Sequence, residues 1–231
     1  MELKKEEKVL SVGLSGKYGS GKGQVSTFLV ELSPKTKVLP FAKLLKDYVS
    51  LLGGIDPLLL YSDEGKQKPN MIQEKRSFDE LKPKIVELFG GYEFKKNQLE
   101  ELSKECIDFM DGNSSWGKTL QFVGTEVFRN KVDSDFWIKV WKLNYEKYKE
   151  TGVIVDDVRF KNEVKLLKEL GFQIWRINSP IEERMKRIKT VRDPNHISET
   201  ELDDFKEFDK IIYNDSSLEE LKKSVTWLYY C

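Results

Sequence analysis

The segment GLSGKYGSGKGQVS, residues 13–26, holds the residues of this chain whose types and spacing point most directly to chemistry. Gly16, Gly21 and Lys22 fit the spacing G-x-x-x-x-G-K of a loop that binds nucleotide phosphates. Glycines let successive backbone N–H groups face phosphate oxygens, and the lysine can reach the β- and γ-phosphates. We therefore predict a nucleotide site at residues 16–22, called the phosphate loop below. A glycine-rich turn without a ligand is the alternative.

The residue after the lysine departs from this pattern. Gly23 stands where a serine or threonine would place its hydroxyl on Mg²⁺. Water can replace one such ligand, because Mg²⁺ usually keeps several waters and binds substrate phosphates directly. A loop that binds nucleotide without turnover is the alternative. The residues predicted to bind the nucleotide here are Gly16, Lys17, Tyr18, Gly19, Ser20, Gly21, Lys22, Gly23 and Gln24.

A second candidate is the acidic end of the apolar run VIVDDVRF. Asp156 and Asp157 follow β-branched residues, which is where a carboxylate would orient a metal ion or its water shell. We assign the metal to Asp157 first and to Asp156 as the alternative. Either aspartate could instead cap the helix expected near Lys161.

Arginines form the third group, because phosphoryl transfer needs cations around the moving group more than it needs a strong base. Arg184 and Arg187 are three residues apart on an expected helix and therefore share a face. A solvated surface charge is the alternative for each arginine. The single histidine, His196, is expected to be a loop residue. The arginine candidates are Arg129, Arg159, Arg184, Arg187 and Arg192.

The elements that must position these groups alternate between strand and helix. Such alternation predicts an α/β fold with a parallel sheet wrapped by helices and with ligands at the carboxyl ends of the strands. Strands are expected at residues 9–14, 37–40, 151–157, 172–177 and 210–213. Helices are expected at residues 23–32, 41–54, 81–89, 97–110, 118–130, 133–150, 161–170, 180–191 and 217–230.

Length and charge limit the remaining choices. A chain of 231 residues favours one domain, and we read about 55–116 as an inserted, mainly helical cap. Lys+Arg and Asp+Glu both number 39, which argues against nucleic-acid and membrane-surface partners. Two cysteines are too few for a disulfide framework, and no apolar run is long enough for a membrane span. We expect a soluble cytoplasmic protein, monomeric or homodimeric.

Several segments together resemble the phage-type deoxynucleoside monophosphate kinases, a family of P-loop nucleotide kinases. The likeness rests on GLSGKYGSGKGQV, PFAKLLK, YSDEGK, LQFVGTEVFRNKVDSDFWI, VIVDDVRFKNEVKLLKELGFQIWRI, HISETELDDF and IIYNDSSLEEL. It covers most of the chain except the N-terminal tail and about residues 70–115. GTEVFR, DVRFKNE and SETELDD are much more specific than the phosphate loop.

The resemblance implies a three-layer P-loop kinase fold with an arginine-bearing lid at about 180–200. It also implies transfer of the γ-phosphoryl group of ATP, with Mg²⁺, to a deoxynucleoside 5′-monophosphate. By this resemblance the catalytic residues are Lys22, Arg129, Asp157, Arg159 and Arg187. Arg184 and Arg187 would also bind ATP. The substrate-binding residues would be Phe41, Lys46, Arg129, Lys131, Trp137 and Arg159.

Two interpretations stay open at this point. Trp137 could stack on the base or could simply fill the core. The chain departs from the family at Gly23, at Lys43 after FA and at Lys118 before LQ. Another small-molecule kinase, similar to dephospho-coenzyme A kinase or phosphomevalonate kinase, is therefore an alternative, as is a catalytically silent nucleotide-binding protein.

Overall fold

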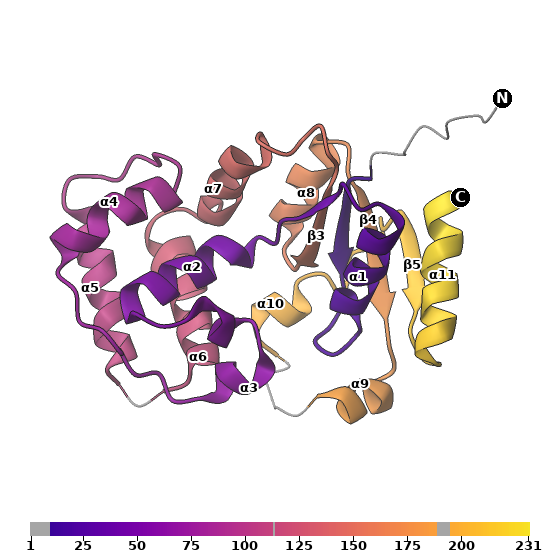
Figure 1. Cartoon of the computed structure of the whole chain (residues 1–231), viewed down its shortest axis with the longest axis horizontal. Helices are drawn as coiled ribbons and strands as arrows, with labels where there is room; N and C mark the ends of the chain where they lie inside the picture. The colour runs from indigo at the N-terminus through magenta and orange to yellow at the C-terminus, as the bar shows by residue number, and fades with distance from the viewer. Residues whose placement is uncertain (1–9, 113, 189–194) are drawn as a thin grey trace. The chain divides into compact units, whose positions relative to one another are not determined.

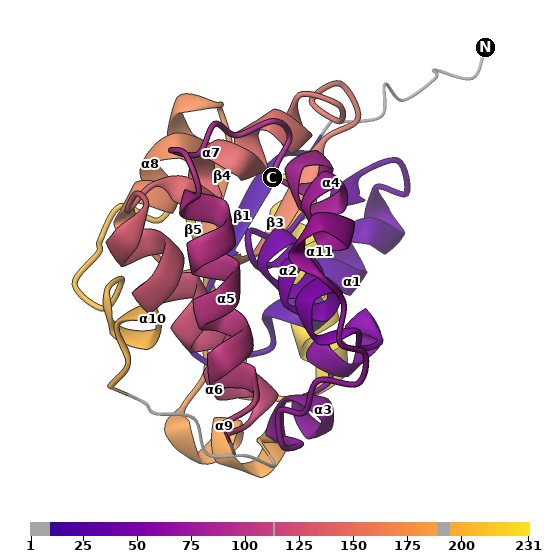
Figure 2. The same ribbon diagram turned by 90° about the vertical axis from the view of Figure 1, so that its left-hand side faces the viewer.

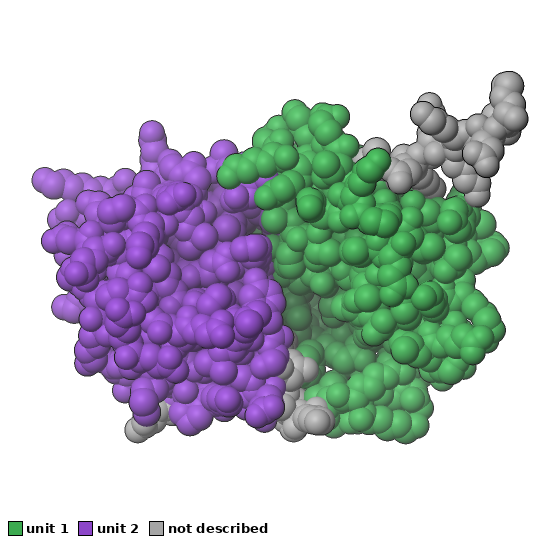
Figure 3. Space-filling view, in the orientation of Figure 1, with its two compact units in different colours: residues 1–40, 145–231 green, residues 41–144 purple. Residues whose placement is uncertain are grey.

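The computed structural model describes residues 10–112, 114–188 and 195–231. The chain divides into two compact units, which Figure 3 colours separately. Unit 1 consists of Met1–Pro40 and Tyr145–Cys231, and unit 2 is Phe41–Asn144. Unit 2 contains the expected cap at about 55–116. We describe each unit by itself.

Unit 1 is built on a parallel five-stranded sheet with the order β2-β3-β1-β4-β5. The central strand β1 is buried along its whole length, which is the pattern of a parallel sheet covered on both faces. This confirms the predicted α/β class. The strands are β1 (Val12–Ser15), β2 (Lys37–Val38), β3 (Val153–Val158), β4 (Gln173–Asn178) and β5 (Lys210–Tyr213).

Helices cover both faces of this sheet (Figure 1). On one face, α1 and α11 pack side by side, and their apolar residues Phe28 and Val225 join a buried cluster with Trp175 of the sheet. On the other face, α8 brings Leu167 so close to Gly13 that a β-carbon there would lie 2.8 Å from it. The helices of unit 1 are α1 (Lys22–Leu32), α8 (Lys161–Glu169), α9 (Ile181–Arg187), α10 (Ile197–Thr200) and α11 (Leu218–Tyr230).

Parallel strands place their carboxyl ends at one edge of the sheet. The phosphate loop follows β1 at this edge, and Arg159 follows β3. Arg176 lies near the end of β4, and Asn214 directly follows β5. Residues that are far apart in the chain therefore meet around the loop.

In the part of unit 2 that the structure describes, the regular elements are all helices, and one isolated antiparallel bridge joins Pro69 to Ser115. Its helix α2 packs against α4 and α5 (Figure 2). The core is rich in aromatic rings, with Phe89, Phe128 and Phe136 in mutual contact. Its elements are α2 (Ala42–Gly53), η1 (Pro57–Leu60), α3 (Asp63–Gln67), α4 (Phe78–Leu88), α5 (Gln98–Met110), α6 (Trp116–Gln121), η2 (Phe122–Arg129) and α7 (Phe136–Tyr145).

The helix expected at 118–130 differs from the prediction. The chain forms the α-helix α6 and then continues as a π-helix, η2, which contains the whole GTEVFR segment. The carbonyl of Gly124 in this π-helix accepts a hydrogen bond from Trp137 Nε1 at 2.9 Å. A π-helix has no distinctive sequence pattern, and its wide turns are frequent at functional sites.

Two other helices are shorter than expected. The α7 helix ends at Tyr145, whose ring packs against Phe172. Residues 146–150, which are mostly charged and exposed, form turns. The α9 helix ends at Arg187, and Ile188 is extended. Arg192 and part of the expected lid lie outside the described residues. Within the described ranges, no helix is long and apolar enough to cross a membrane.

Candidate functional site

The phosphate loop connects β1 to α1 through glycines in conformations that other residues rarely adopt. Gly21 has a φ of 99° and precedes the first residue of α1. A β-carbon on Gly16 would lie 2.5 Å from Ser20 Oγ and 2.6 Å from the carbonyl oxygen of Ile177. The backbone thus turns tightly beneath the amino end of an eleven-residue helix, whose N–H groups and dipole favour anions.

Lys22 lies along the inside of this turn. Its Nζ donates to the carbonyl of Gly16 at 2.6 Å and to that of Lys17 at 3.0 Å. Burial lowers the pKa of Lys22 to about 7, and the charge of Arg159 acts in the same direction, while Glu199 and Asp156 partly oppose them. Anionic oxygens near Nζ would therefore strongly stabilise the charged form of Lys22.

Arg159 lies beside the loop at the end of β3. Its Nη1 forms an ion pair with Glu199 and also donates to the carbonyl of Ser198 at 3.2 Å. On the other side of β1, the end of β4 contributes Arg176, whose Nη1 donates to Ser15 Oγ at 3.0 Å. Two sequence-predicted residues, Lys22 and Arg159, are thus brought together in unit 1, whereas Arg176 and Glu199 were not anticipated.

The turn after β3 is held by Glu163, which sequence reasoning also missed. Its side chain is buried, and Oε2 accepts from the backbone nitrogens of Arg159 at 2.8 Å and Phe160 at 3.0 Å. The signal was the spacing of DVRFKNE, in which a glutamate three residues after Phe160 can reach back to the backbone nitrogen of that residue, as the glutamate of a capping box does. Glu163 therefore fixes the backbone that carries Arg159.

The two strand-end aspartates act on different cations. Asp156 acts electrostatically on Lys22, whereas Asp157 acts on Arg159. Among the described residues, no group of three histidine, cysteine, aspartate or glutamate side chains could hold a metal ion by itself. A metal at this edge would therefore take most of its ligands from substrate oxygens and water.

On the other flank, the loop contacts Asn214, which follows β5. Asn214 Nδ2 donates to the carbonyl of Ser20 at 2.8 Å. Arg184 Nη1 donates to the carbonyl of Tyr18 at 3.3 Å, which ties α9 to the loop. Arg187 lies further out, where Nη1 donates to Ser179 Oγ at 3.2 Å. Both α9 arginines predicted from sequence thus lie on this flank, although only Arg184 bonds the loop directly.

The loop fits phosphate groups by an observation independent of its sequence pattern. Ser20 Oγ and Arg184 Nε are buried and have no hydrogen-bond partner within the described residues. Unsatisfied buried donors are costly, and oxygen acceptors of a ligand would satisfy both. Gly23 differs from the other loop glycines, because a β-carbon there would meet no atom within 4 Å. The position therefore has room for the hydroxyl that the sequence lacks.

Five of the six sequence-predicted substrate residues lie in unit 2. Arg129 ends η2, and its Nη1 donates to the carbonyl of Ser134 at 3.1 Å. Lys131 pairs with Glu105 at 2.5 Å. Lys46 Nζ lies 3.9 Å from the centre of the Tyr61 ring, and the buried ring of Phe41 packs against Trp141. Arg129 and Lys131 are thus two residues apart at the end of η2, whereas Phe41 belongs to the apolar packing.

Trp137 lies in the core of unit 2. Its side chain is 3% exposed, and its ring contacts Phe89, Phe128 and Phe136. These contacts support the packing interpretation, and stacking on a base stays a prediction.

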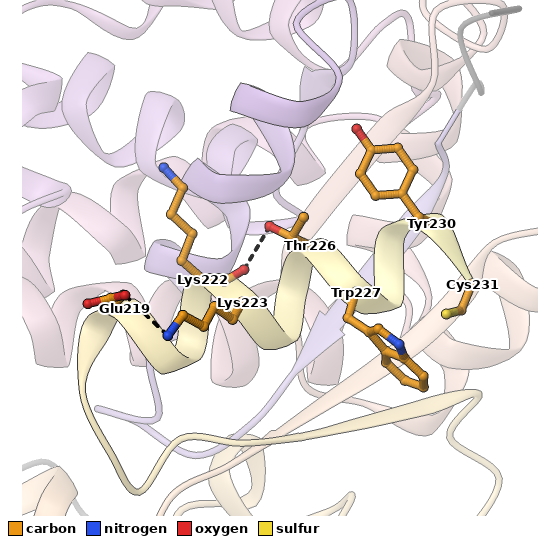
Figure 4. A pocket seen from close by; sticks show the side chains of 7 residues that line it. All are labelled: Glu219, Lys222, Lys223, Thr226, Trp227, Tyr230 and Cys231. Carbon is orange, nitrogen blue, oxygen red and sulfur yellow. Dashed lines mark hydrogen bonds and ion pairs between the residues drawn. The ribbon is translucent and has the colours of Figure 1, made fainter.

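A pocket of about 540 Å³ lies along α11, and none of its lining residues belongs to the phosphate loop. It is lined by residues of α11 and the final Cys231. In Figure 4, the side chains of Trp227 and Tyr230 point to opposite sides of the α11 helix, so these two lining groups do not converge. We assign no chemistry to this surface.

Comparison with known proteins adds a family to this geometry. A model of the deoxynucleotide monophosphate kinase family matches residues 67–225, which is more than half of the chain. The match includes η2, the DVRF turn and Glu199, and it begins after the phosphate loop.

Curated relatives agree with this match. The chain is 29% identical to a deoxynucleotide monophosphate kinase of Escherichia phage RB69 over 61% of this chain and 55% of the relative. It is 29% identical to a putative deoxynucleotide monophosphate kinase of Acanthamoeba polyphaga mimivirus over 66% of this chain and 80% of the relative. It is 26% identical to the deoxynucleoside-5′-monophosphate kinase of Escherichia phage T5 over 68% of this chain and 71% of the relative. The alignment thus spans about half the length of the RB69 protein.

The fold, the loop geometry and these matches lead to one conclusion: the chain belongs to the deoxynucleotide monophosphate kinase family.

Proposed function

We propose that this chain transfers the γ-phosphoryl group of ATP to the phosphate of a deoxynucleoside 5′-monophosphate. The observation that carries the proposal is that Lys22 and Arg159 lie at the same edge of the sheet, where the carboxyl ends of β1 and β3 meet. They are close enough for the charge of Arg159 to lower the pKa of Lys22. Two cations held this close repel each other, and phosphate oxygens between them would relieve the repulsion. The family membership and the phosphate loop favour ATP as the donor.

In this proposal the loop and its neighbours hold the donor. Lys22 exchanges its bonds to the loop carbonyls for bonds to phosphate oxygens. The N–H groups at the amino end of α1 contact the phosphates, and Ser20 and Arg184 supply the buried donors noted above. Arg187, at the outer end of α9, contacts the donor from the same flank.

The acceptor's phosphate oxygen attacks the γ-phosphorus, a new P–O bond forms, and the bond to the bridging oxygen of ADP breaks. The attacking oxygen of the acceptor phosphate is already anionic, so no general base is needed. His196 instead caps α10, since its Nδ1 accepts from the backbone nitrogen of Ser198 in the first turn of that helix. Arg159 stabilises the charge on the transferred group.

Mg²⁺ would neutralise charge on the donor phosphates and help to align them. Asp157 is our first choice to orient the ion or its water shell, and Asp156 is the alternative. Gly23 supplies no hydroxyl, so a water molecule would take that ligand position.

Unit 2 supplies the acceptor site in this proposal. Arg129 ends the GTEVFR segment of η2, Lys131 follows it, and both carry the positive charge that a nucleotide monophosphate requires. Phe41, Lys46 and Trp137 belong to the proposed site by the family resemblance. The organisation as one kinase domain with a cap at 55–116 and a lid at 180–200 also remains a proposal. So do a monomeric or homodimeric state and a cytoplasmic location.

Coupled ADP release from ATP and Mg²⁺ tests the proposal against the deoxynucleoside monophosphates and their ribose counterparts. We expect turnover with at least one deoxynucleotide, lost in Lys22→Ala and kept in Lys165→Ala, an exposed lysine of α8. Silence with all acceptors would contradict the proposal. A subsequent screen with dephospho-coenzyme A and phosphomevalonate, together with ATP binding, would then separate another kinase from a silent nucleotide-binding protein.

A further inference from the structure

The carboxylate of Glu199 connects the phosphate loop to the end of β3. Its Oε1 pairs with Arg159 Nη1, and its Oε2 accepts from the backbone nitrogen of Tyr18 at 3.0 Å. One side chain, from the segment that contains α10, thus holds two elements that the proposed reaction needs.

The same segment reaches the loop a second time. Lys17 Nζ donates to the backbone carbonyl of Glu199 at 2.7 Å and to Asp203 Oδ2 at 2.5 Å. The other oxygen of Asp203 lies 3.6 Å from Arg176 Nη2. Residues 199–203 therefore link the loop to the ends of both strands that flank β1.

Burial distinguishes Glu199 from an ordinary surface partner. Its side chain is 7% exposed, and that of Arg159 is 22% exposed. Bringing a carboxylate out of water costs free energy that an ion pair alone often fails to recover. Well-packed apolar residues would often serve stability equally well, so the retained charge calls for another reason.

The orientation of Arg159 supplies that reason. Its Nη1 is held by Glu199 and by the carbonyl of Ser198. A guanidinium has five N–H donors in a rigid plane, so fixing one nitrogen sets the direction of the others. Arg159 can then donate to phosphate oxygens through its remaining nitrogens without a further loss of side-chain conformational entropy.

We propose that Glu199 is a positioning residue that orients Arg159 and holds the Tyr18 part of the phosphate loop for phosphoryl transfer. This inference rests on the proposed function. It assigns Glu199 no contact with the nucleotide, so its removal lowers the rate of the chemical step more than the affinity for ATP. A carboxylate that merely competes with phosphate would behave differently, because its neutralisation would tighten ATP binding.

Glu199→Gln tests the charge with little change of shape, and Glu199→Ala removes both contacts. Asp204→Asn is the matched control, because Asp204 is an exposed carboxylate in the same segment. The measurements are kcat, KM for ATP and for the acceptor, the Kd of ATP by calorimetry, and hydrogen exchange of the Tyr18 amide without nucleotide. Thermal unfolding of each variant checks that the fold is kept.

We expect kcat of Glu199→Gln to fall by about tenfold or more, while the Kd of ATP changes by less than about threefold. The Tyr18 amide should exchange faster in Glu199→Ala, because it loses its acceptor. Asp204→Asn should match the wild type in every measurement.

An unchanged kcat in Glu199→Gln would overturn the inference, as would an unchanged exchange rate at Tyr18 in Glu199→Ala. Tighter ATP binding with normal kcat would instead make Glu199 a competitor of phosphate. If the wild type itself shows no turnover, the proposed function fails, and the exchange rate at Tyr18 still decides whether Glu199 holds the loop.

Discussion

A β-carbon built on Gly21 would lie 2.4 Å from the side-chain nitrogen of Asn214. That nitrogen donates to the carbonyl of Ser20, so it cannot move away without losing a buried hydrogen bond. The φ of 99° at Gly21 adds a second obstacle to any other residue. Asn214, together with the φ of 99°, therefore restricts the position before Lys22 to glycine.

Replacement of Gly21 by alanine should distort the loop. We expect Gly21→Ala to lower the melting temperature and to weaken ATP binding by about tenfold or more, since loop strain of this kind costs roughly 1–3 kcal/mol. Calorimetry and thermal unfolding measure both effects. Gly23→Ala is the matched control, because its β-carbon meets nothing, and it should be as stable as the wild type or more stable by up to about 1 kcal/mol. Equal losses in the two variants would contradict this account.

A hydroxyl restored at position 23 should strengthen metal use. The space there is open, and the side chain would begin at the second residue of α1. We expect Gly23→Ser to lower the Mg²⁺ concentration that gives half-maximal turnover, by a few-fold, because a protein oxygen replaces a water ligand. Titration of kcat with Mg²⁺ measures this, with Gly23→Ala as the control. No change in the serine variant would indicate that the ion lies elsewhere.

The two aspartates at the end of β3 should separate by function. Asp157→Asn should reduce kcat by about a hundredfold and raise the Mg²⁺ requirement, since it is our first choice to orient the ion. Asp156→Asn should leave the Mg²⁺ requirement nearly unchanged and further lower the pKa of Lys22, because Asp156 is one of the groups that raise it. Parallel Mg²⁺ titrations and pH profiles of kcat/KM would test this. The reverse pattern would move the metal to Asp156.

Nucleotide binding should take up protons near pH 8. The pKa of Lys22 is lowered to about 7, so the lysine is mostly neutral at pH 8, and phosphate oxygens would raise the pKa and protonate it. Near pH 8 the phosphates of ATP are already fully ionised, because their last pKa is about 6, and they cannot mask the effect. Calorimetry in buffers with different heats of ionisation measures the uptake. It should vanish in Lys22→Met at the same pH, and persistence in that variant would exclude Lys22 as its source.

The same shift has a consequence for stability. The pKa of Lys22 in the folded state lies below its ordinary value of 10.5, so the unfolded chain binds more protons between about pH 7 and 10. Lys22 therefore destabilises the fold most below pH 7, and this penalty decreases as the pH rises. Lys22→Met should gain stability over the wild type at pH 7 and lose that advantage toward pH 10, as judged by denaturant unfolding. An advantage that does not depend on pH would contradict the shift.

Glu163 should be required for the turn that presents Arg159. Glu163→Ala leaves the backbone nitrogens of Arg159 and Phe160 without their acceptor, at a cost of about 1–3 kcal/mol. We expect lower stability and lower kcat together. Glu163→Gln keeps an oxygen acceptor and should recover most of the stability. If the alanine variant is as stable as the wild type, the capping role is wrong.

Local patterns predicted the parts of the fold that depend on neighbouring residues. The apolar run before the glycines became β1, and the amphipathic stretch after them became α1. The paired strand and helix after Thr151 also follow their sequence patterns. The π-helix did not follow a local pattern; its Gly124 lies so close to Leu45 that a β-carbon would be 2.9 Å away, and its carbonyl accepts from Trp137, and both partners lie outside the π-helix.

The missed site residues share one cause. Glu199 and Asn214 reach the loop only through tertiary packing, and neither belongs to a pattern with a local chemical meaning. Arg176 and Asn214 could have been found by the rule that selected Asp157, because Arg176 lies near the carboxyl end of β4 and Asn214 directly follows β5. For Glu199 the sequence offered only the SETELDD resemblance, which carries no contact information.

The contact between Asn214 and the carbonyl of Ser20 joins residues separated by 194 positions. Loop closure over such a separation is slow compared with local helix and turn formation. Synthesis from the amino end produces the phosphate loop early, whereas Asn214, which bonds the loop, is made only after β5. The phosphate loop therefore gains this hydrogen bond only after β5 has been synthesised, when all the helices of unit 2 are already part of the chain.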